Sequence, residues 1–160
     1  MKLKNISTAL YLLINLIAFT MSMVFLSAGE FFPYHAEASG MGWSEIPTGL
    51  QLVLMSLIRL AGLGWLVFSL VLGFLTVYYY HIRNEIMAYF IIPALIIVYF
   101  GGVFGITFYV YLQTHANTPW TSSVGIIITD ILAFVCSMLS WRLSKGQNKG
   151  NAGKMIKTEA

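Results

Sequence analysis

The chain has 160 residues, of which 58% are hydrophobic and 9% are charged, and its mean hydropathy is +0.78. So few charged side chains cannot cover the surface of a water-soluble domain, and the composition therefore indicates a membrane domain. The net charge of +3 does not indicate nucleic-acid binding, because the basic residues lie at the edges of apolar segments and in a short tail. We expect the lipid bilayer as a partner and no nucleic acid.

The first apolar segment, residues 6 to 28, follows Lys2 and Lys4. A basic start also opens secretory signal peptides, and Ser27-Ala28-Gly29 would be a tolerable cleavage site. The apolar part is longer than the roughly 7–15 residues of a signal h-region. We therefore interpret it as an uncleaved first membrane span.

Residues 29–50 form the longest connection and combine aromatic residues, glutamates and prolines with no lysine or arginine. Pro33 suits a first helical position and Gly40 suits a helix end, so the pattern predicts a short helix over PYHAEAS. We expect this helix to lie at the membrane interface, because aromatic rings favour the headgroup level. The aromatic residues expected to hold it there are Phe31, Phe32, Tyr34 and Trp43.

Three further apolar segments, residues 51–77, 86–112 and 122–142, are each long enough to cross a hydrocarbon core about 30 Å thick. Pro93 lies early in its segment, where it predicts a mild kink rather than a break. The Gly-, Asn- and Lys-rich residues 144–160 are predicted to form a disordered basic cytoplasmic tail.

The expected fold is all-α, with residues 1–143 forming a single polytopic domain. Four transmembrane helices make a bundle, and the short interfacial helix lies in the first outer loop. Because Cys136 is the single cysteine, an intrachain disulfide and a thiolate metal cluster within the monomer are excluded.

The lysines and arginines outside the four segments all fall on one side of the membrane. They are Lys2, Lys4, Arg83, Arg142, Lys145, Lys149, Lys154 and Lys157. Cytoplasmic loops carry the excess of basic residues in membrane proteins. The distribution therefore predicts that both termini are cytoplasmic.

Small and polar residues recur at steps of three and four along each span, a pattern that favours close helix packing in a bilayer. We expect these four stripes to face the interior of the bundle. They comprise Thr8, Tyr11, Asn15, Ala18 and Ser22 in the first span; Arg59, Gly62, Leu66, Ser69, Gly73 and Thr76 in the second; Gly101, Gly105 and Tyr109 in the third; and Ser123, Asp130, Ala133, Ser137 and Ser140 in the fourth.

Arg59 and Asp130 are the two charges within the apolar segments. Each lies about eight residues, or about 12 Å, from the outer edge expected for its span, taken as residue 51 or 122. A charge in a membrane needs a partner. The shared depth predicts that the two form the main ion pair of the bundle, directly or through one water. This pair could fix the helix register or form part of a ligand or proton site.

The outer loop and the second span supply the remaining candidates for ligand binding or ion pairing, which are Glu30, Tyr34, His35, Glu37 and Trp65. The histidines do not predict a metal site, because His35 and His115 lie in different loops and lack the i, i+4 spacing. The common hydrolase, nucleotide-binding and thiol-redox motifs are absent from the sequence. We predict no catalytic residue, metal or cofactor.

The stretch from Phe31 to Trp65 contains PYHA, a loop tryptophan, GLQ and R-x-x-G-x-G-W. It resembles a pattern in a family of small uncharacterised bacterial integral membrane proteins with four spans, and it covers about a fifth of the chain. The resemblance implies no activity, and it places the protein in a bacterial plasma (inner) membrane. It also implies that one group of residues brings the outer loop over the arginine. The group is Pro33, Tyr34, His35, Ala36, Gln51, Arg59, Gly62, Gly64 and Trp65.

Three functions agree with these features. The missing catalytic motifs favour a non-enzymatic bundle with a structural, accessory or small-molecule-binding role. The second is a membrane-embedded enzyme or redox partner that acts on a lipid or quinone, with Arg59, Asp130 and His35 lining an outward pocket. The third is a small transporter or proton-coupled carrier, and a four-span chain would have to oligomerise to form a pathway. A homo-oligomer or another membrane protein is a candidate partner. A wet cavity reaching Arg59 would favour the second or third function, and a dry core would favour the first.

Overall fold

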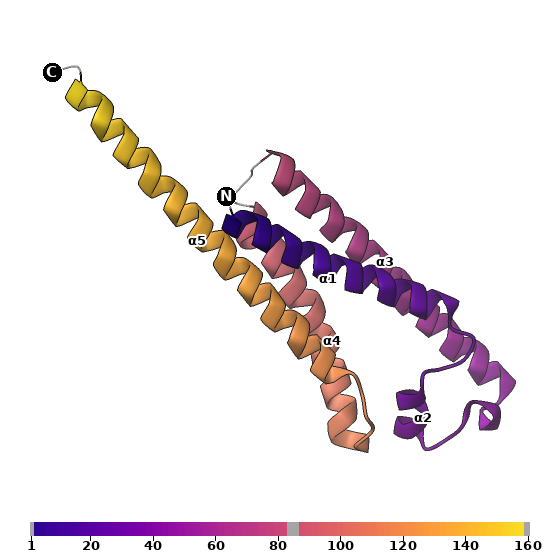
Figure 1. The fold of residues 1–160 in the computed structure, drawn as a ribbon. Helices are drawn as coiled ribbons and strands as arrows, with labels where there is room; N and C mark the ends of the chain where they lie inside the picture. Colours follow the sequence, from indigo (N-terminus) through magenta and orange to yellow (C-terminus); the bar gives the residue numbers. More distant parts are fainter. Residues whose placement is uncertain (1, 83–86, 159–160) are drawn as a thin grey trace.

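The structure, a computed structural model, describes the backbone of residues 2–82 and 87–158 and the side chains of residues 3–79, 81 and 87–143. Four helices are long and apolar enough to cross a membrane. They are α1 (Lys2–Ser27), α3 (Thr48–Ile82), α4 (Ile92–Thr114) and α5 (Trp120–Thr158) (Figure 1). The predicted all-α fold with four membrane-spanning helices is confirmed, and the chain is a multi-pass membrane protein.

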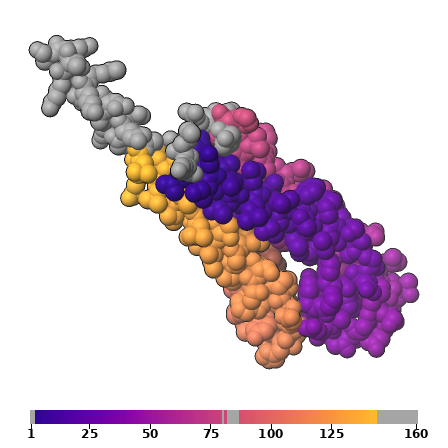
Figure 2. Space-filling model, viewed as in Figure 1, coloured from indigo at the N-terminus to yellow at the C-terminus, as the bar shows by residue number. Residues whose placement is uncertain are grey.

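Helix α1 is the central element of the bundle. It packs along α3 on one side and along α5 on the other, and α5 packs in turn against α4. Figure 2 shows the surfaces of α1 and α5 side by side. Lys2 and the end of α3 lie at one end of the bundle, which we call the terminal end (Figure 1). The opposite end, which holds the outer loop and the connection between α4 and α5, is the loop end.

The short helix predicted for PYHAEAS is α2, Pro33–Ser39. Pro33 lies in its first turn, where a missing N–H leaves no hydrogen bond unmade. Gly40 ends the helix with a φ of 68°, and its N–H donates to the Ala36 carbonyl at 2.9 Å. A left-handed φ favours glycine, so this residue lets the chain turn toward the 3₁₀ turn η1, Trp43–Glu45, and on to α3.

The outer loop folds onto the first turns of α3. Phe31 and Ile46 are buried against Met55 and Ile58, and the Phe31 ring meets the Trp43 ring edge to face at 5.1 Å. We call this group the loop-end cluster. Phe31, expected to contact lipid at the interface, is therefore buried against the protein. The cluster covers one side of the part of α3 that precedes Arg59.

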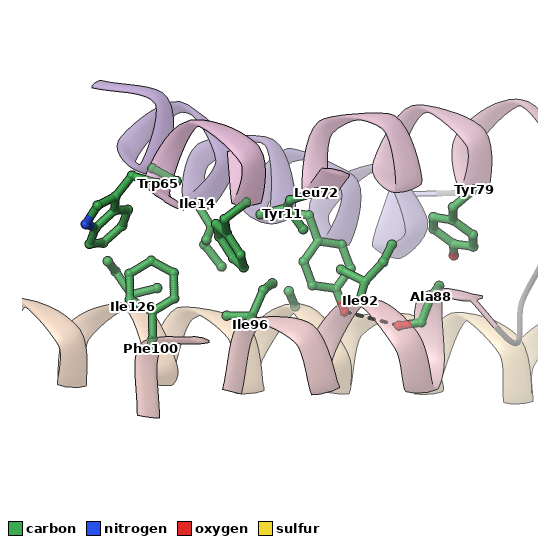
Figure 3. Close-up of a cluster of buried hydrophobic side chains, with 13 residues drawn as sticks. Tyr11, Ile14, Trp65, Leu72, Tyr79, Ala88, Ile92, Ile96, Phe100 and Ile126 are labelled. Carbon is green, nitrogen blue, oxygen red and sulfur yellow. Dashed lines mark hydrogen bonds between the residues drawn. The ribbon is translucent and has the colours of Figure 1, made fainter. Parts of the chain in front are cut away.

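A larger core joins the four long helices (Figure 3). Tyr11, Ile14 and Ala18 of α1 are fully buried in it. Aromatic rings connect α3 to α4: Phe68 stacks on Tyr99 with ring centroids 4.1 Å apart. The other buried members are Trp65, Leu72, Tyr79, Ala88, Ile92, Ile96, Phe100, Ile126 and Ala133.

The third span begins as a π-helical turn, η2 (Met87–Ile91), immediately before α4 and its early proline, Pro93. In a π turn the carbonyl of residue 88 would pair with the N–H of residue 93, which proline lacks. The Tyr11 hydroxyl donates to this Ala88 carbonyl from α1 at 3.4 Å (Figure 3). A side chain of the central helix thus supplies a donor where the proline removes one.

The stripes predicted for the first, second and fourth spans face the interior. Arg59 of the second stripe is the exception, because its side chain is exposed. Thr8, Ser22, Ser69 and Ser137 are among their buried members. The prediction for the third span is wrong, because a Cβ added to Gly101 or Gly105 would meet nothing within 4 Å, and Tyr109 is 64% exposed. Helix α4 instead buries the large residues Ile92, Ile96 and Phe100, because it is too far from α3 for small residues to fill the space.

Helix α5 continues to Thr158, where we expected a disordered tail from residue 144. No proline interrupts the chain after Trp120, so each later residue keeps the backbone N–H that an α-helix requires. The backbone therefore remains helical beyond the apolar part of α5. Arg83 and the side chains of Lys145, Lys149, Lys154 and Lys157 lie outside the described residues.

Candidate functional site

Arg59 lies at the loop end of the bundle. A Cβ added to Gly62 would lie 3.0 Å from Leu26 and Phe25, so Gly62 is level with the last turn of α1. Arg59 is about one turn nearer the loop end, beyond the last residues of α1, and its side chain is exposed. The outer loop therefore does not cover it.

Asp130 lies near the middle of the bundle. The Ser137 hydroxyl hydrogen-bonds to the Ser7 hydroxyl of the antiparallel α1. Asp130 is seven residues from Ser137, and Ile14 is seven residues from Ser7 in the same direction. Asp130 is therefore level with Ile14, about halfway along α1. Its side chain is 0% exposed.

The predicted ion pair between Arg59 and Asp130 is wrong. Measured along α1, their levels differ by about fifteen residues, or about 22 Å. Both carboxylate oxygens of Asp130 lack a hydrogen-bond partner among the described residues. The depth estimate failed because it placed the outer edge of the second span at residue 51. Residues 48–58 of α3 instead extend past the end of α1, where the loop-end cluster packs on them.

The aromatic candidates of the outer loop stabilise α2. His35 Nδ1 accepts a hydrogen bond from the Phe32 N–H at 3.2 Å, and the imidazole lies 4.1 Å from the Tyr34 ring, centroid to centroid. Burial lowers the pKa of His35 and raises the pKa of Tyr34, so both side chains are favoured in their neutral forms. A neutral imidazole can accept at Nδ1, so His35 caps the start of α2.

The other candidates lie apart from one another. Glu37 Oε2 accepts a hydrogen bond from the Asn117 N–H at 2.8 Å and so joins α2 to the connection between α4 and α5. Glu30 is exposed, whereas Trp65 is buried in the main core against Phe100. The structure thus brings Tyr34 and His35 together, but it does not gather Arg59, Asp130 and His35 into one pocket.

A different set of polar side chains gathers between α1 and α5. The Ser7 and Ser137 hydroxyls hydrogen-bond to each other, and Tyr11 interacts with both serines and with Asp130. All four residues are buried, and we call them the Asp130 cluster. Sequence reasoning named Tyr11 and Ser137 only as helix-packing residues and missed Ser7. The signal was the i, i+4 spacing of Ser7 and Tyr11, which places both on one face of α1.

The Asp130 cluster is chemically unusual for the middle of a membrane bundle. An ionised carboxylate buried without a partner is strongly unfavourable in an apolar interior. A neutral carboxylic acid is tolerated far better, and hydroxyls can both donate hydrogen bonds and accept them. The arrangement is therefore suited to binding a cation, of which a single proton is the smallest.

A groove of about 370 Å³ lies between α1 and α3 near the terminal end. Its buried residues are Thr8 and Thr76, whose hydroxyls donate to carbonyls of their own helices at 3.0 and 2.8 Å. The more exposed lining residues are Asn5, Ala9, Leu12, Val77 and His81. The groove is thus apolar toward the middle of the bundle and polar at the terminal end, and it lies at the opposite end from Arg59.

These two features, a buried carboxylate cluster and a lateral groove, are the candidate sites. Comparison of the chain with protein-family models, with curated proteins and with solved structures finds no match.

Proposed function

We propose that the protein is a non-enzymatic multi-pass protein of a bacterial plasma membrane that binds a lipid-like amphiphile in the groove between α1 and α3. Both termini lie in the cytoplasm. The groove is the observation that carries this proposal, because it is open to the side of the bundle and combines an apolar part with a polar end. Its volume is in the range typical of small-molecule sites.

The orientation is inferred from the charges. Lys4 and Arg142 lie at the terminal end, whereas Glu30, Glu37 and Glu45 lie at the loop end. Arg59 is the one described lysine or arginine at the loop end, because all the others belong to the terminal side in sequence. An excess of lysine and arginine on one side favours the cytoplasm for that side.

A binding role is favoured over catalysis because the candidate polar groups are dispersed. Catalytic groups must lie within hydrogen-bond reach of one another or of a common substrate. Arg59 lies at the loop end, His35 caps α2, and Asp130 lies midway along the bundle. The groove opens at the opposite end from Arg59, so it does not provide the outward pocket that an enzyme using Arg59 would need.

The groove fits an anionic amphiphile of the inner leaflet. An acyl or isoprenoid tail would lie along Ala9, Leu12 and Val77, and the headgroup would lie beside Asn5 and His81. Lys4 directly precedes Asn5 in α1, and its Nζ lies 4.9 Å from the centroid of the Tyr79 ring. Basic residues at the cytoplasmic surface attract anionic lipids, which makes a phospholipid such as phosphatidylglycerol a suitable probe.

Native mass spectrometry of the detergent-purified protein tests the groove. Ala9→Phe places a ring in it, and Val98→Phe adds the same ring on a 75% exposed position of α4 as a matched control. We expect phosphatidylglycerol to remain bound to the natural protein and the control. Ala9→Phe should weaken binding about tenfold, or by about 1.4 kcal/mol. Equal retention by all three proteins, or none by the natural protein, would exclude the groove as the binding site.

A further inference from the structure

Asp130 is fully buried, and neither of its carboxylate oxygens has a hydrogen-bond partner among the described residues. Asn15 Oδ1 is the other buried side-chain atom that lacks a partner among the described residues, whereas several buried hydroxyls of the bundle are satisfied locally. Thr76 donates to the Leu72 carbonyl at 2.8 Å, and Ser22 donates to the Phe19 carbonyl at 2.7 Å. Asp130 is therefore not explained by helix packing alone.

Among the described residues, the groups around Asp130 provide no positive charge. Tyr11 is the titratable side chain that faces it from α1, and Tyr79 of α3 interacts with Tyr11. On α4, Tyr99 packs against Phe68 and Trp65 of α3. Among the described cations, Lys4 lies over the Tyr79 ring, and Arg59 and Arg142 are exposed near opposite ends of the bundle.

We propose that Asp130 is an intramembrane proton-binding site that exchanges its proton with the terminal, cytoplasmic side through the hydroxyls of Tyr11, Ser7 and Ser137. The ligand is a proton: the carboxylate takes it up and becomes a neutral carboxylic acid, and no other bond changes. A metal cation would need several oxygens around it. The Ser7 and Ser137 hydroxyls instead bond to each other, about two turns from Asp130.

Buried hydroxyls lie nearer to Asp130 on the terminal side than on the loop side. Toward the terminal end, the Tyr11 hydroxyl donates a hydrogen bond to the Ala88 carbonyl. The Tyr11 oxygen is therefore free to accept a hydrogen bond from a neighbouring hydroxyl or acid. Toward the loop end, Ala18 and Ile126 are buried and separate Asp130 from Ser22 and Ser123. Proton exchange therefore has hydroxyl groups available on the terminal side and apolar packing on the other.

Infrared spectroscopy of the protein reconstituted in liposomes tests the protonation state. We expect a carbonyl stretching band of a protonated carboxyl group at neutral pH in the natural protein. The band should be absent from Asp130→Asn, which preserves the size and polarity of the neutral acid. Asp130→Glu should keep a band at a shifted position, and it serves as the second variant if Asp130→Asn does not fold. Absence of the band from the natural protein at neutral pH would overturn the proposal.

The direction of exchange is tested by following the same band after transfer into deuterated buffer. Tyr11→Phe removes the hydroxyl beside Asp130 and should slow the deuterium shift of the band several-fold. Ser22→Ala removes a buried hydroxyl on the loop side and should leave the rate unchanged. Equal rates in Tyr11→Phe and the natural protein would contradict the hydroxyl route. Disappearance of the band on addition of sodium chloride would contradict proton binding and indicate a cation site.

Discussion

Replacing Tyr11 by alanine is expected to lower the free energy of unfolding by about 3–5 kcal/mol, the range for removing a large aromatic side chain from a packed core. Tyr11 is 0% exposed and heads the fully buried side chains ranked by volume. Tyr11 extends from α1 toward η2 and α5, so the cavity left by alanine cannot be closed by movement of one exposed side chain. The Ala88 carbonyl would also lose a donor from outside its own helix.

Thermal unfolding of the detergent-solubilised protein measures this effect. Tyr11→Phe keeps the ring and removes only the hydroxyl, so we expect a loss of about 1 kcal/mol. Tyr109→Ala is the matched control, because Tyr109 is 64% exposed and its replacement removes the same side-chain volume outside the core. If Tyr11→Ala were as stable as Tyr109→Ala, the central position of Tyr11 in the core would be wrong.

Gly62→Ala should destabilise the protein by about 1–3 kcal/mol through overpacking between α1 and α3. A Cβ at Gly62 would lie 3.0 Å from the backbone nitrogen and the Cγ of Leu26 and from the Cβ of Phe25. Two of these atoms belong to the backbone or lie next to it, so they cannot move aside without shifting α1. The glycine therefore sets how closely the two helices approach at the loop end.

Gly64→Ala provides the control on the same helix, two residues away. A Cβ at Gly64 would meet nothing within 4 Å, so alanine should be neutral or should stabilise the helix by about 0.5–1 kcal/mol. Unfolding temperatures of the two variants, measured side by side, separate packing from helix propensity. Equal stability of Gly62→Ala and Gly64→Ala would show that α1 and α3 do not approach closely at Gly62.

Features that depend on local chemistry could be predicted from the sequence. Helix α2 follows from Pro33 at its start and Gly40 at its end, and both positions are confirmed. The inward faces of α1 and α5 follow from helical periodicity, which places Asp130 in the interior. The sequence therefore predicted that Tyr11 lies on the inward face of α1 and Asp130 on the inward face of α5.

The difference in level between Arg59 and Asp130 along the bundle could not be predicted, because it depends on where the second span begins. Residues 50–58 are mostly apolar and carry no charge, and their sequence does not distinguish contact with lipid from contact with protein. Here Met55 and Ile58 pack against Phe31 and Ile46, so this part of α3 continues past the end of α1. Only the folded outer loop shows that Arg59 lies at the loop end.

The residues that carry the family resemblance lie mainly in structural positions. His35 caps α2, Gln51 Nε2 donates to the Trp43 carbonyl at 2.8 Å, and Trp65 is buried in the main core. Gly62 lies at the close approach of α1 and α3. These contacts hold the outer loop against α3, whereas Arg59 stays exposed beside it. The resemblance itself stays a prediction.

We propose a four-span topology in which the outer loop faces outside and both termini face the cytoplasm. It is tested most directly by cysteine accessibility in intact cells with a membrane-impermeant maleimide, on a Cys136→Ser background. Ser39→Cys, at the exposed end of α2, should be labelled without permeabilisation. Asn148→Cys, beyond the apolar part of α5, should be labelled only after permeabilisation. The opposite pattern, or labelling of both positions in intact cells, would contradict the account.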